Sequence, residues 1–168
     1  PDVQEKLRKE INDVLGDKED PDADDLKDMV YMRKVMLETL RCYAIIPTLA
    51  RYSVTDFEFK DLNLTIPKGT DVIIPMAILN RDEQIWERPG EFDPERFEGT
   101  EMSNARKGFF PFGYGSRVCI GNTLAQLEVG VFMCHLLRHY RFEVDPTFKI
   151  KIMSGISLTT SNGIRVRV

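Results

Sequence analysis

A single cysteine set among glycines is the residue of this chain best suited to metal chemistry. The segment reads Phe112-Gly-Tyr-Gly-Ser-Arg-Val-Cys-Ile-Gly121, and the helix that we predict over 120–139 begins directly after Cys119. Free backbone amides and the positive dipole at the start of a helix favour a thiolate over a thiol. The sequence therefore makes Cys119 a candidate metal ligand.

The residues that precede this cysteine suit a flat, charged ligand. Gly113 and Gly115 allow a tight loop whose backbone can approach such a ligand closely. Arg117 supplies a permanently charged fork for a carboxylate or a phosphate. Taken alone, a glycine loop before a helix is more common as a turn or an anion site than as a metal site. A Walker-type phosphate loop is excluded, because no Gly-Lys-Ser/Thr follows the glycines.

Composition and charge restrict the classes of function. The chain has 168 residues, of which 42% are apolar and 30% are charged, as expected for one globular domain. The net charge is −4 and no block of basic residues stands out, which argues against nucleic acid as a partner. The longest apolar stretch, over 119–137, contains several polar residues and indicates a buried helix, not a membrane span.

The other cysteines and the two histidines are expected to be structural. Three cysteines without CxxC spacing are typical of neither a disulfide framework nor a zinc site. We expect Cys42 and Cys134 to lie within helices as small apolar fillers. His135 and His139 are expected in the core or on the surface, and not as ligands.

The elements that must position Cys119 are mainly helical. Apolar residues at helical spacing predict helices, and alternation with period two predicts strands. The fold class is therefore mainly α with small β-sheets (α+β). The irregular stretch over 81–118 is rich in aromatic residues and is typical of a functional or cofactor-packed segment. The predicted elements are helices over 2–15, 28–43 and 120–139, a short helix after Asp22 or Asp24, a β region over 48–75, a helical turn at 76–80, and two C-terminal hairpins with turns near Ser154-Gly155 and Ser161-Asn-Gly163.

Three motifs in a fixed order give the chain a family resemblance. Phe112-xx-Gly115-x-Arg117-x-Cys119-x-Gly121 resembles the haem-binding signature of the cytochrome P450 superfamily. Glu38-Thr-Leu-Arg41 resembles its ExxR motif, and Pro94-Glu-Arg-Phe97 resembles its PxRF motif. The resemblance covers essentially all of residues 1–168, as the C-terminal part of a P450 domain of the microsomal eukaryotic type.

This resemblance implies roles for individual residues around haem b. Cys119 would be the axial thiolate on the iron. Phe112 would pack beside the sulfur and limit the access of water. Arg117 would pair with a haem propionate, and Arg51 with the second. The implied cofactor-binding set is Arg51, Phe112, Gly113, Arg117, Cys119 and Gly121.

The resemblance also implies a buried triad of charges. Glu38 and Arg41, taken alone, could form an exposed ion pair on one helical face. In the family this pair meets Arg96 in a buried cluster that fixes the cysteine loop.

An apolar border to a substrate pocket is implied as well. Most members carry a proline soon after ExxR, whereas this chain delays it to Pro47, so that the loop on the substrate side is expected to be reshaped. The expected pocket border is Ile45, Ile46, Leu49 and Ile156.

The activity that the resemblance implies is that of a haem-dependent monooxygenase. It would insert one oxygen atom of O₂ into a lipophilic substrate, with electrons from NADPH through a cytochrome P450 reductase-type donor. The full-length parent would lie on the cytoplasmic face of the endoplasmic reticulum membrane, with no anchor in this chain. Because the chain begins at Pro1, we expect it to hold only the proximal half of the haem site and to be inactive alone. The alternatives are a non-oxygenating haem-thiolate isomerase or dehydratase, a haem-binding or sensor protein with no turnover, and an inactive truncated product that binds nothing.

Overall fold

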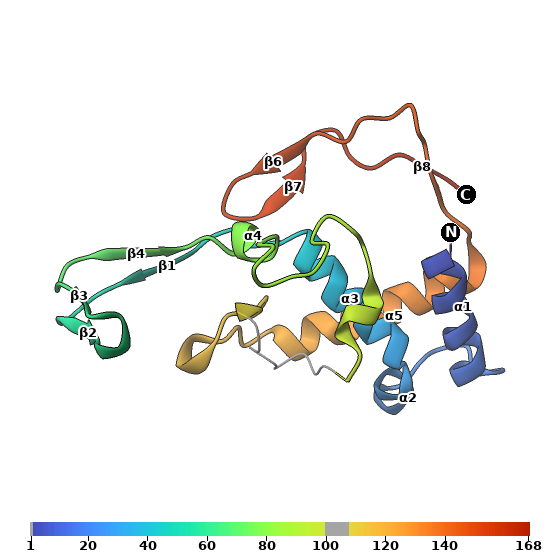
Figure 1. The fold of residues 1–168 in the computed structure, drawn as a ribbon. Coiled ribbons are helices and arrows are strands. Elements are labelled where there is room, and N and C mark those ends of the chain that lie inside the picture. Colours follow the sequence, from blue (N-terminus) through green and yellow to red (C-terminus); the bar gives the residue numbers. More distant parts are fainter. Residues whose placement is uncertain (1, 100–107) are drawn as a thin grey trace.

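The computed structural model describes residues 2–99 and 108–168. Helices gather at one end of the molecule, and two-stranded sheets extend from them as a long arm and a C-terminal hairpin (Figure 1). This arrangement confirms the predicted α+β class. In chain order, with η for 3-10 helices, the elements are α1 (Asp2–Leu15), α2 (Ala23–Asp28), α3 (Val30–Cys42), β1 (Leu49–Tyr52), β2 (Phe57–Phe59), η1 (Lys60–Leu62), β3 (Leu64–Ile66), β4 (Asp71–Ile74), α4 (Met76–Leu79), η2 (Pro94–Phe97), η4 (Gly115–Arg117), α5 (Asn122–His139), β5 (Glu143–Val144), β6 (Ile152–Ser154), β7 (Leu158–Thr160) and β8 (Val166–Arg167).

The expected short helix after the first turn is α2, and Asp22 caps it. The Asp22 carboxylate accepts hydrogen bonds from the amides of Asp24 and Asp25, both at 2.9 Å. The Asp25 side chain accepts in turn from the Asp22 amide, which completes a capping box. Met29 separates this helix from α3, so that the helix predicted over 28–43 begins at Val30.

The sheets are antiparallel pairs, and one of the two predicted C-terminal hairpins is wrong. β1 pairs with β4, β2 with β3 and β6 with β7, the last through the expected turn at Ser154-Gly155. β8, however, pairs with β5 and not with β7. The Asn162 side chain bonds back to the Lys151 amide and the Lys149 carbonyl, so that the turn at Ser161-Asn-Gly163 is held against the segment that precedes β6.

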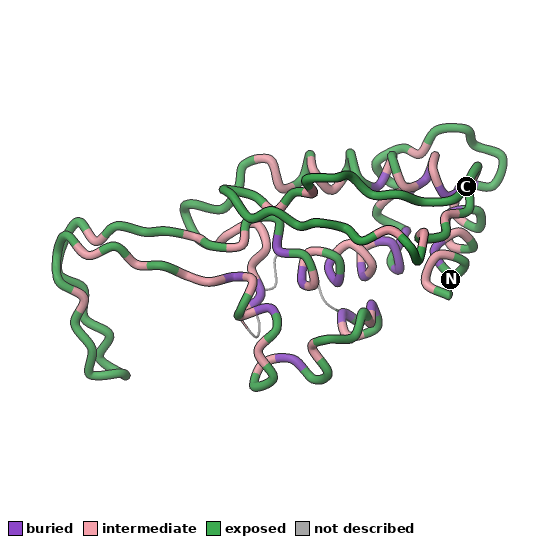
Figure 2. Tube along the Cα trace, turned by 90° about the horizontal axis from the view of Figure 1, so that it is seen from above, coloured by how far each residue is buried: buried purple, intermediate pink, exposed green. Residues whose placement is uncertain are grey.

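The main apolar core lies between α1, α3 and α5. Figure 2 shows the buried residues concentrated in the helices, whereas the arm is almost entirely exposed. Cys134 is buried as expected, with its sulfur 3.6 Å from that of Met29. At Gly130 a Cβ atom would lie 3.0 Å from Leu26, so that the glycine lets α2 pack closely on α5. The buried members of this core are Leu7, Ile11, Leu15, Met29, Tyr31, Met32, Cys134 and Leu137.

Helix α5 is less covered than the sequence suggests. A helix that is apolar on most faces needs cover on nearly all sides, but among the residues of α5 only Gly130, Cys134 and Leu137 are buried. Leu124 and Phe132 are about 60% exposed. The described residues pack on one side of α5 only, so that this chain leaves much of the apolar surface of the helix open, as we expect of a part of a larger domain. Among those residues, no helix has both the length and the apolar character needed to cross a membrane.

Helix α1 satisfies the ends of the two other long helices. The Glu10 carboxylate accepts the amides of Tyr31 and Met32, at 2.6 and 2.7 Å, where α3 has no side-chain cap of its own. Arg8 donates to the carbonyls of Leu137 and Tyr140 at the end of α5. These contacts satisfy backbone groups that a helix leaves unpaired at its ends. Helix α1 therefore fixes α3 and α5 relative to each other.

A buried charge cluster joins α3 to η2. Arg41 donates from Nε to Glu38 at 2.7 Å, and Arg96 donates from its own Nε to the same carboxylate at 3.1 Å. The side chains of Glu38 and Arg41 have no exposed surface, and that of Arg96 is 9% exposed. The structure thus brings together the three residues of the expected triad.

The remaining donors of Arg41 bind the irregular segment that follows α4. They reach the carbonyls of Asn80 and Pro89 at 2.9 Å and that of Glu91 at 3.0 Å. The hydrogen bonds with Glu38 raise the pKa of Arg41, which therefore stays charged. The hydrogen bonds of this one guanidinium therefore satisfy backbone carbonyls that are not paired in a helix or a sheet.

An aromatic cluster continues from the charge cluster toward the cysteine loop. The ring of Phe97 lies 5.7 Å from that of Trp86 and 5.3 Å from that of Phe109. Leu37 of α3 is fully buried against the same rings. Within the described part of the irregular stretch, Trp86, Phe97 and Phe109 thus form a small packed core, whereas Phe92 and Tyr114 are exposed.

Removal of Arg41 tests how far the fold depends on the charge cluster. Arg41→Ala removes two of the four hydrogen bonds to the buried Glu38 carboxylate and takes a donor away from three backbone carbonyls. It should lower the free energy of unfolding by about 3–5 kcal/mol. Chemical denaturation of the natural protein measures this loss. Arg88→Ala is the control, because its ion pair with Glu91 is half exposed and should contribute less than about 1 kcal/mol. Equal losses in the two variants would contradict the structural role given to Arg41.

The buried thiol of Cys134 should make the core sensitive to high pH. Burial raises the pKa of this thiol from 9.0 to about 11. The unfolded chain therefore releases this proton at lower pH than the folded protein, and stability that is complete below pH 8 declines between about pH 9 and pH 11. The decline should reach about 2 kcal/mol. Denaturation at several pH values in this range measures the free energy of unfolding, which should fall less with rising pH in Cys134→Ala than in the natural protein. An equal fall in the two proteins would contradict the assignment.

Candidate functional site

Cys119 sits at the end of a loop that closes on itself through backbone hydrogen bonds. Its amide donates to the Phe112 carbonyl at 2.8 Å, and the Gly113 amide donates to the Phe110 carbonyl at 2.9 Å. Gly113 and Gly115 have φ angles of 81° and 70°, in the left-handed region that side chains disfavour. These two glycines are therefore needed for the shape of the loop and not only for close approach by a ligand.

The cysteine side chain is exposed and lies just before α5. The helix begins at Asn122, two residues later than predicted, and the Asn122 amide donates to the Cys119 carbonyl at 3.3 Å. A Cβ atom at Gly121 would lie 3.8 Å from the Cys119 sulfur, so that this glycine keeps the side of the thiol uncrowded. The loop therefore presents the sulfur outward from a rigid backbone.

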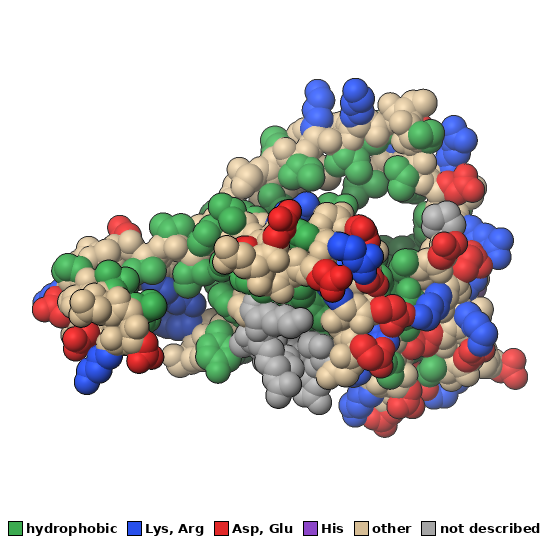
Figure 3. All heavy atoms as spheres, in the orientation of Figure 1, with side chains coloured by type: hydrophobic (Ala, Val, Ile, Leu, Met, Phe, Trp, Pro, Cys, Tyr) green, Lys and Arg blue, Asp and Glu red, His purple; other side chains and the backbone are tan. Residues whose placement is uncertain are grey.

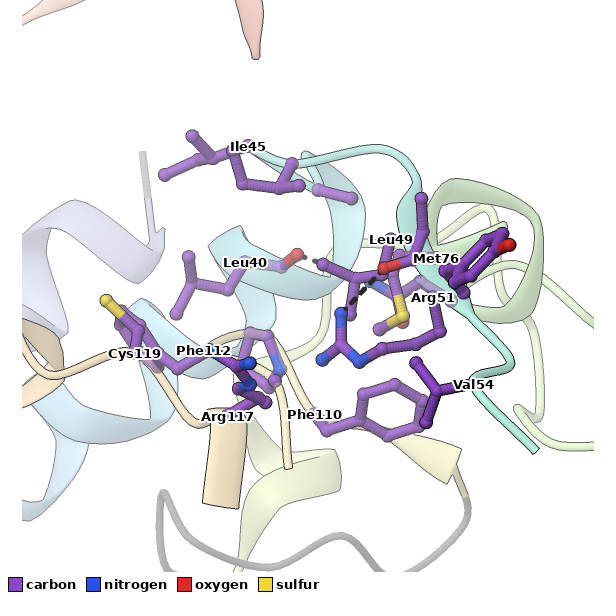
Figure 4. A pocket seen from close by; sticks show the side chains of 17 residues that line it. Leu40, Ile45, Leu49, Arg51, Val54, Met76, Phe110, Phe112, Arg117 and Cys119 are labelled. Carbon is purple, nitrogen blue, oxygen red and sulfur yellow. Dashed lines mark hydrogen bonds between the residues drawn. The ribbon is translucent and has the colours of Figure 1, made fainter. Parts of the chain in front are cut away.

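Beside this loop is a cavity of about 910 Å³, which falls in the range of small-molecule sites. Figure 4 shows it between the end of α3, strand β1 and the cysteine loop. Most of its wall is apolar. The lining residues are Leu40, Ala44, Ile45, Ile46, Leu49, Ala50, Arg51, Tyr52, Val54, Met76, Asn80, Phe110, Pro111, Phe112, Gly113, Arg117 and Cys119.

Among the described residues of this wall, the charged side chains are those of two arginines. Arg51 comes from β1 and Arg117 from η4, and both reach toward the cavity (Figure 4). The Arg51 guanidinium donates to the Ala50 carbonyl at 2.8 Å. Within the described residues, neither arginine forms an ion pair with a carboxylate. The cavity thus suits a largely apolar ligand that carries negative groups.

The expected substrate border lies only partly on this cavity. Ile45, Ile46 and Leu49 line it, but Ile156 does not. Ile156 is 92% exposed, at the turn between β6 and β7. The same hairpin is bonded to the loop after α3, because the Leu158 amide donates to the Ile45 carbonyl at 2.7 Å.

Several residues of the wall were missed by sequence reasoning. Met76 and Asn80 flank the helical turn α4, and Val54 follows β1. Knowledge that β1 pairs with β4 would have identified these residues, because this pairing brings the chain after Ile74 beside the loop after α3. Periodicity alone does not give that pairing.

Cys42 and Cys134 lie within helices, His135 is half-buried and His139 is exposed. The Arg41 guanidinium donates to the Cys42 sulfur at 3.1 Å, so that Cys42 is not the simple apolar filler that we expected. Burial also raises the pKa of the Cys42 thiol. His135 lies 3.3 Å from the Asp20 carboxylate, as expected of a surface histidine. Among residues 2–99 and 108–168, no cluster of three or more His, Cys, Asp or Glu side chains could hold a metal ion.

Figure 3 shows where apolar side chains meet solvent. They gather along the arm and on the side of the C-terminal segment that faces the helices. On the arm these include Tyr52, Val54, Phe57 and Ile73, all more than half exposed. The apolar character of the cavity wall therefore continues onto the neighbouring surface.

Comparison with known proteins agrees with the geometry. The family model described as cytochrome P450 matches residues 1–167. Cytochrome P450 72A11 of Arabidopsis thaliana is 37% identical over 88% of the chain and 29% of its own length. Probable cytochrome P450 6a23 of Drosophila melanogaster is 36% identical over 99% of the chain and 34% of its own length. Cytochrome P450 3A17 of Cavia porcellus is 39% identical over 92% of the chain and 31% of its own length.

The chain spans about a third of the length of these curated relatives. The match nevertheless extends over nearly every residue of this chain, and it includes the glycine loop, the exposed cysteine and the buried charge cluster. On these grounds the chain belongs to the cytochrome P450 family.

Proposed function

We propose that this chain supplies the cysteine side of a haem-thiolate site in a monooxygenase. One observation carries the proposal: an exposed cysteine on a closed glycine loop borders an apolar cavity whose charged side chains are both arginines. Cys119 would be the iron ligand, since thiolates are established axial ligands of haem iron. Glu38, Arg41 and Arg96 would keep the cysteine loop in place through η2 and the aromatic cluster next to it.

The residues present fit haem b in its chemistry. Haem is a flat, largely apolar molecule with two carboxylates, and the cavity combines an apolar wall with Arg51 and Arg117. Arginine is well suited to carboxylates, because its planar fork can donate two parallel hydrogen bonds. Phe112, Gly113 and Gly121 would leave the flat face room to approach and would limit water beside the sulfur.

Bound haem would supply the activation of O₂, which a thiolate ligand favours by donating electron density to the iron. The chain's own residues would do the positioning. Cys119 would hold the iron, Arg51 and Arg117 would orient the propionates, and the apolar wall would exclude water. Water exclusion strengthens each of these electrostatic contacts.

The proposed reaction is the insertion of one oxygen atom of O₂ into a lipophilic organic substrate, with electrons from NADPH through a reductase-type donor. The apolar side chains of Ile45, Ile46 and Leu49 on the cavity wall support a lipophilic substrate. Family membership supports the redox partner and a location at the endoplasmic reticulum membrane. NADPH-dependent oxidation by the natural protein with an added reductase tests the reaction, and its absence across lipophilic substrates would count against it.

The assignment of the ligand is tested by changing one cysteine at a time. The ferrous carbon monoxide complex of the natural protein should show the red-shifted Soret band of thiolate ligation. Cys119→Ser should lose this band, because the band requires a soft thiolate sulfur and serine offers only a hard hydroxyl oxygen. Cys134→Ser is the matched control and should keep it, since that thiol is buried against Met29. The reverse pattern would overturn the assignment of Cys119.

The two arginines should govern how tightly haem is held. Arg51→Ala and Arg117→Ala each remove a charge-assisted hydrogen bond worth about 1.5–3 kcal/mol, so that haem should be released at least about tenfold faster. Transfer of haem to excess apomyoglobin measures the rate. Arg141→Ala is the control, because that side chain is 73% exposed and pairs with Glu5. A rate equal to the control in both variants would exclude them as propionate partners.

A further inference from the structure

A second set of ion pairs holds η2 beside the buried triad. Lys34 of α3 lies one turn before Glu38, and its ammonium donates to the Glu95 carboxylate at 2.9 Å. The same ammonium bonds Glu98. Glu95 also pairs with Lys6 of α1. Two helices therefore hold one short 3-10 segment through a shared carboxylate.

Lys34 differs from the other lysines of the described chain that form ion pairs in how little of it meets solvent. Its side chain is 10% exposed, against 57% for Lys6, 52% for Lys18 and 74% for Lys27. A buried ammonium is costly unless it is paired. Hydrogen bonds with Glu98 and Glu95 raise the pKa of Lys34, so that its charge persists. The carboxylates of Glu95 and Glu98 are therefore needed to stabilise the charge of Lys34 at this buried position.

Three successive residues of η2 are each held by a different group. Glu95 faces Lys34, Arg96 donates to Glu38 at 3.1 Å, and Phe97 packs 5.3 Å from the ring of Phe109. The triad alone fixes one side of the segment. The pairs of Lys34 hold the segment at Glu95 and at the following Glu98, and these further points of attachment restrict the rotation of η2 about its own axis.

This rotation bears on the cysteine loop through the aromatic cluster. Phe109 is the last residue of the aromatic cluster before the loop. The backbone carbonyl of the next residue, Phe110, accepts a hydrogen bond from the Gly113 amide at 2.9 Å. Phe112 then accepts the Cys119 amide at 2.8 Å. A shift of Phe97 would move Phe109 and with it the base of the loop, since packed rings leave little free volume.

We propose that Lys34 is a positioning residue for the Cys119 thiolate, acting through Glu95, η2 and the Phe97–Phe109 contact. The inference rests on the proposed function and extends it, because it adds a salt-sensitive support to the buried triad. Lys34 touches neither the cavity nor the loop. Its effect should therefore appear in how long the iron–sulfur bond is retained.

The test compares Lys34→Met with Lys27→Met in the natural protein loaded with haem. Methionine keeps the length and apolar stem of lysine and removes its charge. The loss of the thiolate Soret band of the ferrous carbon monoxide complex is followed with time under mild denaturant. We expect this loss to be about fivefold faster in Lys34→Met than in the natural protein, and unchanged in Lys27→Met, whose pair with Asp24 is exposed.

Glu95→Gln and salt provide an arm that does not depend on the folding of Lys34→Met. Glu95 is 47% exposed, so that its replacement should be tolerated, and it should speed the loss of the band in the same direction. Raising the salt concentration should accelerate the loss in the natural protein and less so in Glu95→Gln, because the pairs are screened.

Each outcome bears on a different statement. If the natural protein shows no thiolate band, the proposed function fails and this inference fails with it. If the band is present but Glu95→Gln and Lys34→Met both lose it at the rate of Lys27→Met, the positioning role is wrong and the proposed function stands. If Lys34→Met lowers global stability while the band persists at the control rate, Lys34 serves only the fold and the inference is overturned.

Discussion

The buried carboxylate of Glu38 is the group on which the rest of the site depends. It accepts one arginine from its own helix and a second from η2, and it also accepts the Asp93 amide at 2.7 Å. A charge without exposed surface cannot exchange its partners for water, so each partner is fixed in place. Residues 80–97, which follow α4 and have little regular secondary structure, acquire their shape from these bonds and from the aromatic cluster beside them.

Much of the site could be predicted because short motifs encode it. The glycine spacing around Cys119 requires left-handed backbone at two positions, and the structure has it at Gly113 and Gly115. The grouping of Glu38 with Arg41 follows from helical spacing. Its connection to Arg96, by contrast, rested on family resemblance, because nothing in the local sequence places a residue 58 positions away beside Glu38.

What could not be predicted depends on long-range pairing. The partner of β8 is β5, and the wall of the cavity includes Met76, because strands pair across distances that periodicity does not encode. The position of Lys34 was missed for a related reason. A lysine on a helix is expected to be solvated, and only the approach of η2 makes this one buried. Side chains covered by a distant segment are thus where sequence reasoning fails most readily.

The contacts that α1 makes with α5 have a consequence for the order of folding. Arg8 bonds carbonyls 129 and 132 residues away, and Gln4 bonds Phe142, 138 residues away. A ribosome adds roughly 5–20 residues per second, so that the start of this chain waits about ten seconds or longer for its partner to be synthesised. During that interval the apolar side of α1 has no α5 to cover it. Newly made chains are therefore most in need of chaperone protection before the last helix emerges.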